Sequence, residues 1–257
     1  MQIVLDAFGR PQSVVVLGGT SDIATSLIDT LVAEGCGTVV LAGRDPRRLD
    51  QAAARLLASG AQAAPTVVFD AIDPAGAGDV VAKCEAAAGG SVDLVVVAVG
   101  ELGDQDRDMA SPERVAQMVT VNFTWPAAAL AEVATRLRTQ GQGRIVVLST
   151  IAGVRVRPAN ALYGSAKRGL DAFAMALADE LVGSGVSLHV VRPGFVHSKM
   201  TAGHKPAPFA VSPEEVTAAV RRGIAADQRV IWAPGVLRWV SVLLRLLPPS
   251  VWRRLPG

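Results

Sequence analysis

Tyr163 and Lys167 stand four residues apart, a spacing that places both side chains on one face of a helix. A free phenol has a pKa of about 10 and is a poor acid or base at neutral pH. A cation beside the phenol stabilises the phenolate and lowers that pKa. We therefore expect Tyr163, the only tyrosine in the chain, to protonate a carbonyl oxygen while a hydride adds to the carbonyl carbon.

Thr150 lies thirteen residues before Tyr163, directly after an apolar run with strand character. Its hydroxyl is expected to hold the substrate oxygen, and Ser149 is the alternative. Arg155 and Arg157 lie between Thr150 and Tyr163 and are expected beside the same cleft. A guanidinium suits a phosphodiester, although two solvated loop charges would give the same pattern.

A glycine turn near the amino end is the candidate site for a dinucleotide. The apolar run Ser13–Leu17 leads into this turn, and a helical pattern follows it. Glycine lets the backbone turn tightly beside a pyrophosphate, and a helix N-terminus supplies N–H groups and a positive dipole end. An ordinary strand-to-helix turn is the alternative. The expected cofactor-binding residues of this turn are Gly18, Gly19, Thr20, Ser21, Asp22 and Ile23.

The residues that follow the next two apolar runs bear on which nicotinamide cofactor binds. A base after the second strand favours a 2′-phosphate, and an acid favours a free 2′-hydroxyl. Arg44 fits the first case and Asp45 fits the second, so these residues leave both NADH and NADPH open. Asp70, after the third run, is expected near the adenine amino group.

Short apolar runs alternate with longer helical patterns along the chain. The runs are almost entirely apolar, as in strands buried on both faces of a parallel sheet. The expected strands are Ser13–Leu17, Thr38–Ala42, Thr66–Phe69, Leu94–Val99, Arg144–Leu148 and Ser187–Val191. The expected helices are Ile23–Ala33, Arg47–Ser59, Val80–Ala88, Pro112–Asn122 continuing into Trp125–Gln140, and Tyr163–Gly183. This alternation predicts an α/β fold with a doubly wound parallel sheet of the Rossmann type, whose ligands bind at the carboxyl ends of the strands.

Composition excludes several other classes of protein. A formal net charge of +2 argues against a nucleic-acid binder, because such proteins carry a strong basic excess. Cys36 and Cys84 form no CxxC or Cys/His pattern, so we expect no metal site. The first residues lack the basic and apolar regions of a secretory signal, which predicts a cytoplasmic location and leaves the periplasmic face open.

The chain has no internal repeat or linker, so we expect one domain over residues 1–235 and an apolar, basic tail over 236–257. The tail begins with a helix candidate, Val236–Leu247, of about 18 Å at ~1.5 Å per residue. That length is short of the ~30 Å hydrocarbon core. We predict that the tail lies at a membrane surface, with packing on the core or on another subunit of a homo-oligomer as the alternative. Its charged residues are Arg238, Arg245, Arg253 and Arg254, without an acid.

The span from Ser13 to about Thr201 resembles the short-chain dehydrogenase/reductase family. In that family the tyrosine donates or accepts the proton, the lysine lowers the tyrosine pKa and holds the nicotinamide ribose, and a serine fixes the substrate oxygen. The resemblance assigns these roles to Tyr163, Lys167 and Thr150, with threonine in place of the family's serine. It also assigns the family's catalytic asparagine to Asn122.

Further segments carry or weaken this resemblance. Pro193-Gly194 is similar to the nicotinamide-side segment of the family, which puts Pro193 and Ser198 near the carboxamide. The family's Asn-Asn-Ala-Gly segment reads Val97-Ala98-Val99-Gly100, which keeps Gly100 at the cofactor. Asp22 and Ala24 replace the second and third cofactor glycines. These departures mark a divergent branch.

Four segments resemble one branch of the family. They are the motifs around the glycine turn and Tyr163, Gly153–Arg157, and Trp232-Ala233-Pro234 before the tail. The members of this branch are actinobacterial reductases of decaprenylphosphoryl-ribose epimerisation. The resemblance implies reduction by NADH of the 2-keto group of a polyprenylphosphoryl pentose, which gives decaprenylphosphoryl arabinose. It implies a flavin-dependent oxidase as partner and a polyprenyl-phosphate lipid as substrate. A generic keto-reductase for a soluble or acyl-chain carbonyl is the alternative.

Overall fold

The computed structural model describes residues 10–252 and contains one parallel sheet of seven strands. Their order is β3-β2-β1-β4-β5-β6-β7, so the chain reverses its direction of winding between β1 and β4. A ligand-binding crevice is expected at such a switch point. The expected doubly wound sheet is therefore confirmed. The strands are β1 (Ser13–Leu17), β2 (Thr38–Gly43), β3 (Thr66–Val68), β4 (Leu94–Val97), β5 (Gly143–Leu148), β6 (Val186–Pro193) and β7 (Val230–Ala233).

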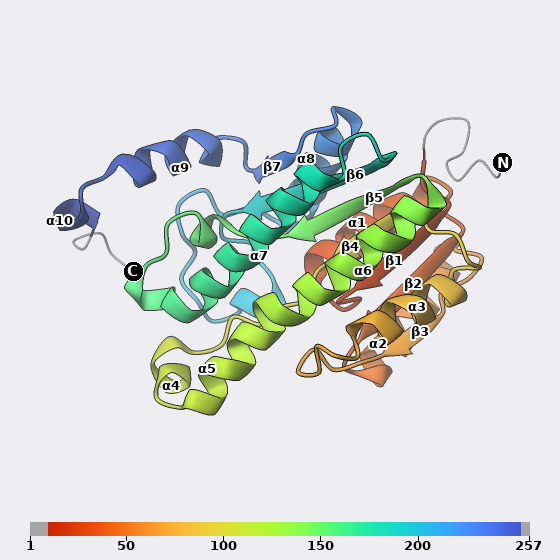
Figure 1. The fold of residues 1–257 in the computed structure, drawn as a ribbon, viewed down its shortest axis with the longest axis horizontal. Coiled ribbons are helices and arrows are strands. Elements are labelled where there is room, and N and C mark those ends of the chain that lie inside the picture. The colour runs from red at the N-terminus through yellow and green to blue at the C-terminus, as the bar shows by residue number, and fades with distance from the viewer. Residues whose placement is uncertain (1–9, 253–257) are drawn as a thin grey trace.

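Helices cover both faces of this sheet (Figure 1). The helices of the main body are α1 (Asp22–Ala33), α2 (Pro46–Ala58), α3 (Ala77–Ala87), α4 (Gln105–Met109), α5 (Pro112–Val119), α6 (Trp125–Gln140), α7 (Ala161–Glu180) and α8 (Pro213–Ala225). A π-helical turn, Thr120–Thr124, joins α5 to α6. Helices α1, α2 and α8 pack on one face, and α3, α6 and α7 pack on the other.

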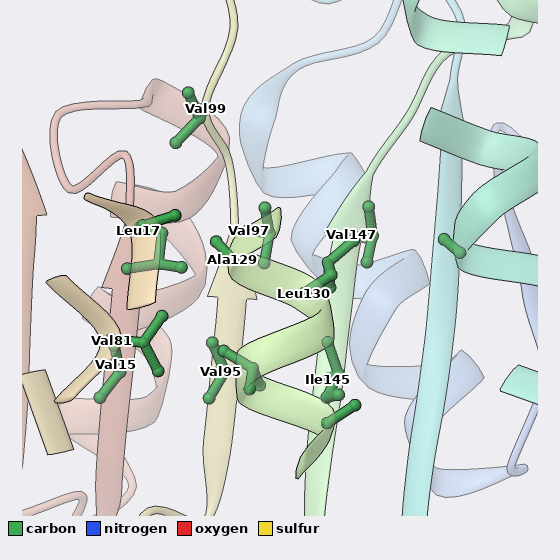
Figure 2. Packing of buried hydrophobic residues seen from close by; sticks show 14 of the residues in the cluster. Val15, Leu17, Val81, Val95, Val97, Val99, Ala129, Leu130, Ile145 and Val147 are labelled. Carbon is green, nitrogen blue, oxygen red and sulfur yellow. The ribbon is translucent and has the colours of Figure 1, made fainter. Parts of the chain in front are cut away.

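The buried faces of the strands explain this two-sided packing. Val15 and Leu17 of β1 lie in the core beneath α3, α6 and α7, while Val14 and Val16 lie in the core beneath α1, α2 and α8. Figure 2 shows Ala129 and Leu130 of α6 lying over the side chains of β4 and β5. Because both faces are covered, nearly every residue of the central strands is apolar.

The domain also contains elements that the sequence did not predict, among them α4, β7 and α8. Strand β7 pairs with β6 at the edge of the sheet and has only four residues, two of which are half-exposed. Helix α8 begins with a capping box in which Ser212 and Glu215 each bind the other's backbone N–H. That pairing is a recognised helix-start signal, and the sequence Ser212-Pro213-Glu214-Glu215 carries it.

The tail folds as α9 (Leu237–Leu246) and α10 (Pro249–Trp252), which lie at the end of the molecule toward which β5 and β6 point (Figure 1). Only Leu237 and Ser241 of α9 are buried. Trp239, Leu243 and Leu246 are exposed by 69%, 61% and 75%. Within residues 10–252, no helix has both the length and the apolar character needed to cross a membrane. Arg253 and Arg254 lie outside the described residues.

Candidate active site

Helix α7 holds Tyr163 and Lys167 above the carboxyl ends of β4 and β5. The Lys167 side chain is buried, and its Nζ donates hydrogen bonds to the carbonyl oxygens of Val99 at 3.0 Å and Leu148 at 3.2 Å. These bonds fix the ammonium where the two strands end. Strand β4 stops at Val97, two residues before the predicted end, and the Val99 carbonyl beyond it accepts from the lysine.

Burial controls the ionisation of this pair. Loss of solvation raises the pKa of Tyr163 to about 12, because the phenolate is the charged form. The same cause lowers the pKa of Lys167 to about 8, because the ammonium is the charged form. The sequence predicted a lowered tyrosine pKa, whereas burial raises it in the structure. Tyr163 therefore carries a proton at neutral pH.

Asn122 lies in the π-helical turn between α5 and α6 and is fully buried. Its Nδ2 donates to the carbonyl oxygens of Glu101 and Met118, each at 3.0 Å, and its Oδ1 accepts from the Glu101 N–H at 3.1 Å. Such π-turns occur often at functional sites. Here the turn directs the amide to the segment that follows β4.

Gly100 lies against both of these groups. A Cβ atom at this position would stand 2.8 Å from Oδ1 of Asn122 and 3.0 Å from Nζ of Lys167. Both distances are below ordinary van der Waals contact, so the close approach requires glycine. The structure thus brings Gly100, Asn122 and Lys167 together, as the sequence predicted for one site.

Thr150 and Ser149 differ in what their hydroxyl groups contact. Thr150 follows β5, and its Oγ1 accepts a hydrogen bond from the N–H of Ala152 at 3.2 Å, which leaves its own proton for another acceptor. Ser149 donates to Oδ2 of Asp171 at 2.7 Å. The serine hydroxyl is therefore engaged beneath the site, which favours Thr150 as the substrate-facing residue.

Asp171 and Arg192 form a largely buried ion pair that the sequence did not predict. Asp171 lies on α7, four residues after Lys167, and accepts from Nε of Arg192 at 2.8 Å and from its Nη2 at 2.6 Å. The Arg192 guanidinium lies 5.2 Å from the centre of the Trp232 ring. The four-residue spacing of Tyr163, Lys167 and Asp171 was the available signal. The pair ties α7 to β5, β6 and β7.

The glycine turn has the shape that a dinucleotide phosphate requires. Gly18 has φ +99°, and a Cβ there would meet the Ala98 carbonyl carbon at 2.7 Å. The N–H groups of Gly18 and Gly19 both donate to the Ala42 carbonyl oxygen, at 2.9 and 2.8 Å. This turn is therefore held against both β2 and the segment after β4. The positive φ and the close approach to Ala98 require glycine at position 18, and the turn leads to the N-terminus of α1, where a dinucleotide phosphate would fit.

The helix that begins at this turn starts with an acid. Ser21 caps α1, its Oγ accepting from the Ala24 N–H, and Asp22 is the first helical residue. Thr20 and Ile23 flank these two positions and are half-buried. The Asp22 carboxylate accepts hydrogen bonds from the backbone N–H of Lys199, at 2.6 Å, and from its Nζ, at 3.0 Å.

The residues expected at the adenosine end are exposed or half-exposed. Asp45 caps α2 by accepting from the Arg48 N–H at 3.2 Å, so its carboxylate is used locally. Arg44 is exposed at the end of β2. Asp70 lies two residues beyond β3, and its Oδ1 accepts from the Ile72 N–H at 3.2 Å. Its contact with an adenine stays a prediction.

The nicotinamide-side segment follows β6. Pro193 is the last residue of that strand, and the Gly194 N–H donates to the Ala233 carbonyl oxygen at 2.9 Å. Ser198 begins a short 3-10 turn, Lys199–Thr201, through hydrogen bonds with the Thr201 hydroxyl. A Cβ at Gly194 would meet Leu237 of α9 at 2.9 Å, so the tail helix starts beside this segment.

Arg155 is engaged with the tail rather than turned freely toward the cleft. Its Nη1 donates to the carbonyl oxygens of Leu244 and, at 2.7 Å, Leu247, where α9 ends. Arg157 precedes the 3-10 turn Pro158–Asn160 and is half-buried. Contact of either guanidinium with a substrate phosphate stays a prediction. Over residues 10–252 no group of three or more His, Cys, Asp or Glu side chains could hold a metal ion.

Comparisons with known proteins decide the family. The family model described as short chain dehydrogenase matches residues 12–208, which is most of the chain. The chain belongs to the short-chain dehydrogenase/reductase family. It is therefore a nicotinamide-dependent short-chain oxidoreductase.

Full-length relatives agree with this assignment. An uncharacterised oxidoreductase of Mycobacterium tuberculosis is 46% identical over 95% of this chain and 96% of its own. An uncharacterised oxidoreductase of Streptomyces coelicolor is 42% identical over 97% and 98%. Both alignments extend beyond the region of the family model, so these proteins resemble the chain over nearly its whole length.

Solved structures show the same fold. A short-chain dehydrogenase from Sphingobium yanoikuyae in complex with NADPH superposes with a TM-score of 0.77, at 23% identity, over 93% of this chain and 97% of that one. An actinorhodin polyketide ketoreductase with NADPH gives 0.76, at 23% identity, over 88% and 97%.

Proposed function

We propose that this enzyme reduces the keto group of a membrane-borne substrate, the 2-keto form of a polyprenylphosphoryl pentose. The product would be decaprenylphosphoryl arabinose, a donor for cell-wall arabinan. The observation that carries the membrane part is the exposed apolar face of α9. The first residue of α9, Leu237, lies against Gly194, and the end of the helix is bound by Arg155, so both ends lie beside segments of the candidate site. The sugar part rests on the resemblance to the epimerising reductases.

We assign the acid–base chemistry to Tyr163. A bound nicotinamide cofactor supplies the hydride to the carbonyl carbon. Tyr163, protonated at neutral pH because its pKa is raised to about 12, donates its proton to the carbonyl oxygen as negative charge develops there. The Thr150 hydroxyl donates to the same oxygen and orients it. A high phenol pKa suits reduction, because the catalyst must begin as an acid.

Lys167 and Asn122 are assigned supporting roles at the same site. The Lys167 ammonium would hold the nicotinamide ribose and stabilise the phenolate that remains after proton transfer. Asn122 holds the Glu101 backbone and thereby the segment of Gly100, against which the cofactor would lie. Because Gly100 meets both groups, one segment sets the positions of the lysine and the asparagine.

The α9 helix would lie flat on an anionic membrane. Trp239, Val242, Leu243 and Leu246 follow the spacing of one helical face, and all four are exposed. Arg238 and Arg245 are exposed beside this face, and each could contribute about 1 kcal/mol near anionic lipid. Ser241, which lies between these two arginines in the sequence, is buried and donates to the Arg238 carbonyl oxygen.

The remaining partners and the cofactor follow from the resemblance and from Arg44. A flavin-dependent decaprenylphosphoryl-ribose 2-oxidase would supply the ketone. The resemblance favours NADH. We infer that NADPH also binds, because Asp45 is used as a helix cap while Arg44 is exposed. The enzyme would be peripheral at the cell membrane, and a homo-oligomer remains an open prediction.

The test is reduction of the lipid-borne ketone in vesicles that contain phosphatidylglycerol. The reaction is measured as the loss of NADH absorbance. The triple variant Trp239→Ser, Leu243→Ser, Leu246→Ser should leave the vesicles and lose most activity on the lipid ketone. It should keep activity on a short, water-soluble ketone. Val182→Ser removes an equally exposed apolar side chain elsewhere and is the control.

Two results would overturn the proposal. If the wild-type enzyme reduces soluble ketones but not the lipid ketone, the substrate is wrong and the generic keto-reductase is favoured. If the triple variant changes its oligomeric state in vesicle-free buffer while vesicle binding is unaltered, α9 contacts a second copy of the chain instead of a membrane.

A further inference from the structure

Asp22 is an unusual residue for the start of α1. A carboxylate at a helix N-terminus is favourable for the helix itself, since it interacts with the positive end of the dipole. The same helix end is where a dinucleotide pyrophosphate is expected, and a second negative charge there repels that anion. The site therefore requires a compensating cation if it is to bind a dinucleotide well.

Lys199 supplies that cation from a distant part of the chain. Its Nζ lies 3.0 Å from Asp22 Oδ1, and its backbone N–H donates to Oδ2 at 2.6 Å. The backbone bond fixes the first residue of the 3-10 turn that follows Ser198. The side chain of Lys199 is 77% exposed, whereas that of Asp22 is 20% exposed. The carboxylate of Asp22 is thus mostly buried, while the ammonium of Lys199 is in solvent.

Because the Lys199 ammonium is so exposed, its ion pair with the Asp22 carboxylate is weak. The ammonium can therefore exchange Asp22 for a stronger anion at the same helix end at little cost, while the backbone bond keeps Lys199 in place. Ser198, the residue expected at the nicotinamide carboxamide, is its immediate neighbour. Through this contact Asp22 links the two ends of the expected cofactor site.

We propose that Lys199 binds the cofactor diphosphate, with Asp22 holding its ammonium in the absence of cofactor. The inference rests on the nicotinamide cofactor of the proposed function. It adds a cation from the segment after β6 to the diphosphate site expected at the N-terminus of α1. Because NADH, NADPH and ADP-ribose share the diphosphate, Lys199 acts equally on all three.

Calorimetric titration of the purified, substrate-free protein with each of these three ligands tests the proposal. Lys199→Ala should raise every dissociation constant by about tenfold, the effect of losing one partly exposed charge-assisted bond. Asp22→Asn retains an oxygen for the Lys199 N–H and removes the repulsion, so it should lower the same constants. Lys205→Ala, an exposed lysine in the same segment, is the matched control and should change none of them.

Three other outcomes would refute the assignment of Lys199 to the diphosphate. Unchanged constants in Lys199→Ala would make the ion pair a surface contact only. Weaker binding of NADH but not of ADP-ribose would move Lys199 to the nicotinamide end. A change confined to the Michaelis constant of the ketone would make it a substrate residue. Failure of the wild-type protein to bind any of the three ligands would instead refute the cofactor assignment itself.

Discussion

Asp171→Asn changes one atom of a side chain that accepts three hydrogen bonds beneath the candidate site. The carboxylate binds the Ser149 hydroxyl through one oxygen and the Arg192 guanidinium through both. An asparagine amide has one acceptor oxygen and one NH₂ group. In either orientation the NH₂ group must then face a guanidinium N–H, because Arg192 donates to both oxygens. The substitution therefore leaves the buried cation short of one partner.

The size of the effect follows from the burial of the pair. The Asp171 and Arg192 side chains are 14% and 12% exposed. Breaking a buried ion pair by removing one charge costs about 3–5 kcal/mol, because the other charge stays buried without compensation. For a chain of this size each kcal/mol lowers the melting temperature by roughly 2–4 °C. We expect a fall of about 6–20 °C.

Thermal and urea unfolding, followed by circular dichroism, measure this loss. Glu180→Gln is the matched control, because Glu180 lies on the same helix and pairs with Arg138, yet the two side chains are 61% and 48% exposed. An exposed pair contributes at most about 1 kcal/mol. The double variant Asp171→Leu, Arg192→Met should recover part of the loss, because it removes both charges. If Asp171→Asn is as stable as Glu180→Gln, the pair does not stabilise the domain and the reasoning fails.

Three further predictions concern the reaction. Tyr163→Phe should reduce turnover by about 10²–10⁴-fold, the usual contribution of a general acid. Cofactor affinity, measured by calorimetry, should stay nearly unchanged. Similar turnover in the variant and the wild-type enzyme would contradict the assignment. Gly100→Ala should lower turnover by about 10²-fold, because its Cβ displaces Asn122 and Lys167, whereas Gly235→Ala, whose Cβ meets nothing, should not. The value of kcat/KM for the cofactor should fall as pH rises through about 8, because burial lowers the pKa of Lys167 to that value and the lysine then loses its positive charge. This fall lies well below the Tyr163 pKa of about 12, so it would not report on the tyrosine. A profile that stays flat to pH 10 would show that this charge is not used.

The sheet could be predicted because its strands are buried on both faces. Continuous apolar runs such as Ser13–Leu17 have few other folded environments, and that strand has the predicted bounds. Strand β7 escaped prediction because it lies at the edge and alternates buried with half-exposed residues over a short length. The boundary placed at residue 235 stays a prediction, since α9 is anchored to the body chiefly through Leu237 and Ser241.

Side-chain partnerships were harder to predict than side-chain identities. Lys167 and Asn122 were assigned from motifs, and both meet at Gly100. The contacts of Asp22 with Lys199 join residues at opposite ends of the chain, which no local spacing indicates. The raised pKa of Tyr163 also required the fold, because burial rather than sequence proximity sets its size.

The π-helical turn at Asn122 has a consequence for helical phase. Each residue of an α-helix advances the side-chain direction by about 100°. If all five residues Thr120–Thr124 wound as a regular α-helix instead, the side chains of α6 would be rotated by about that angle relative to α5. Either Asn122 would leave the Glu101 backbone, or Ala129 and Leu130 would turn away from the sheet. The π-turn thus lets one continuous run of helix place Asn122 in the candidate site and Ala129 and Leu130 against the sheet at the same time.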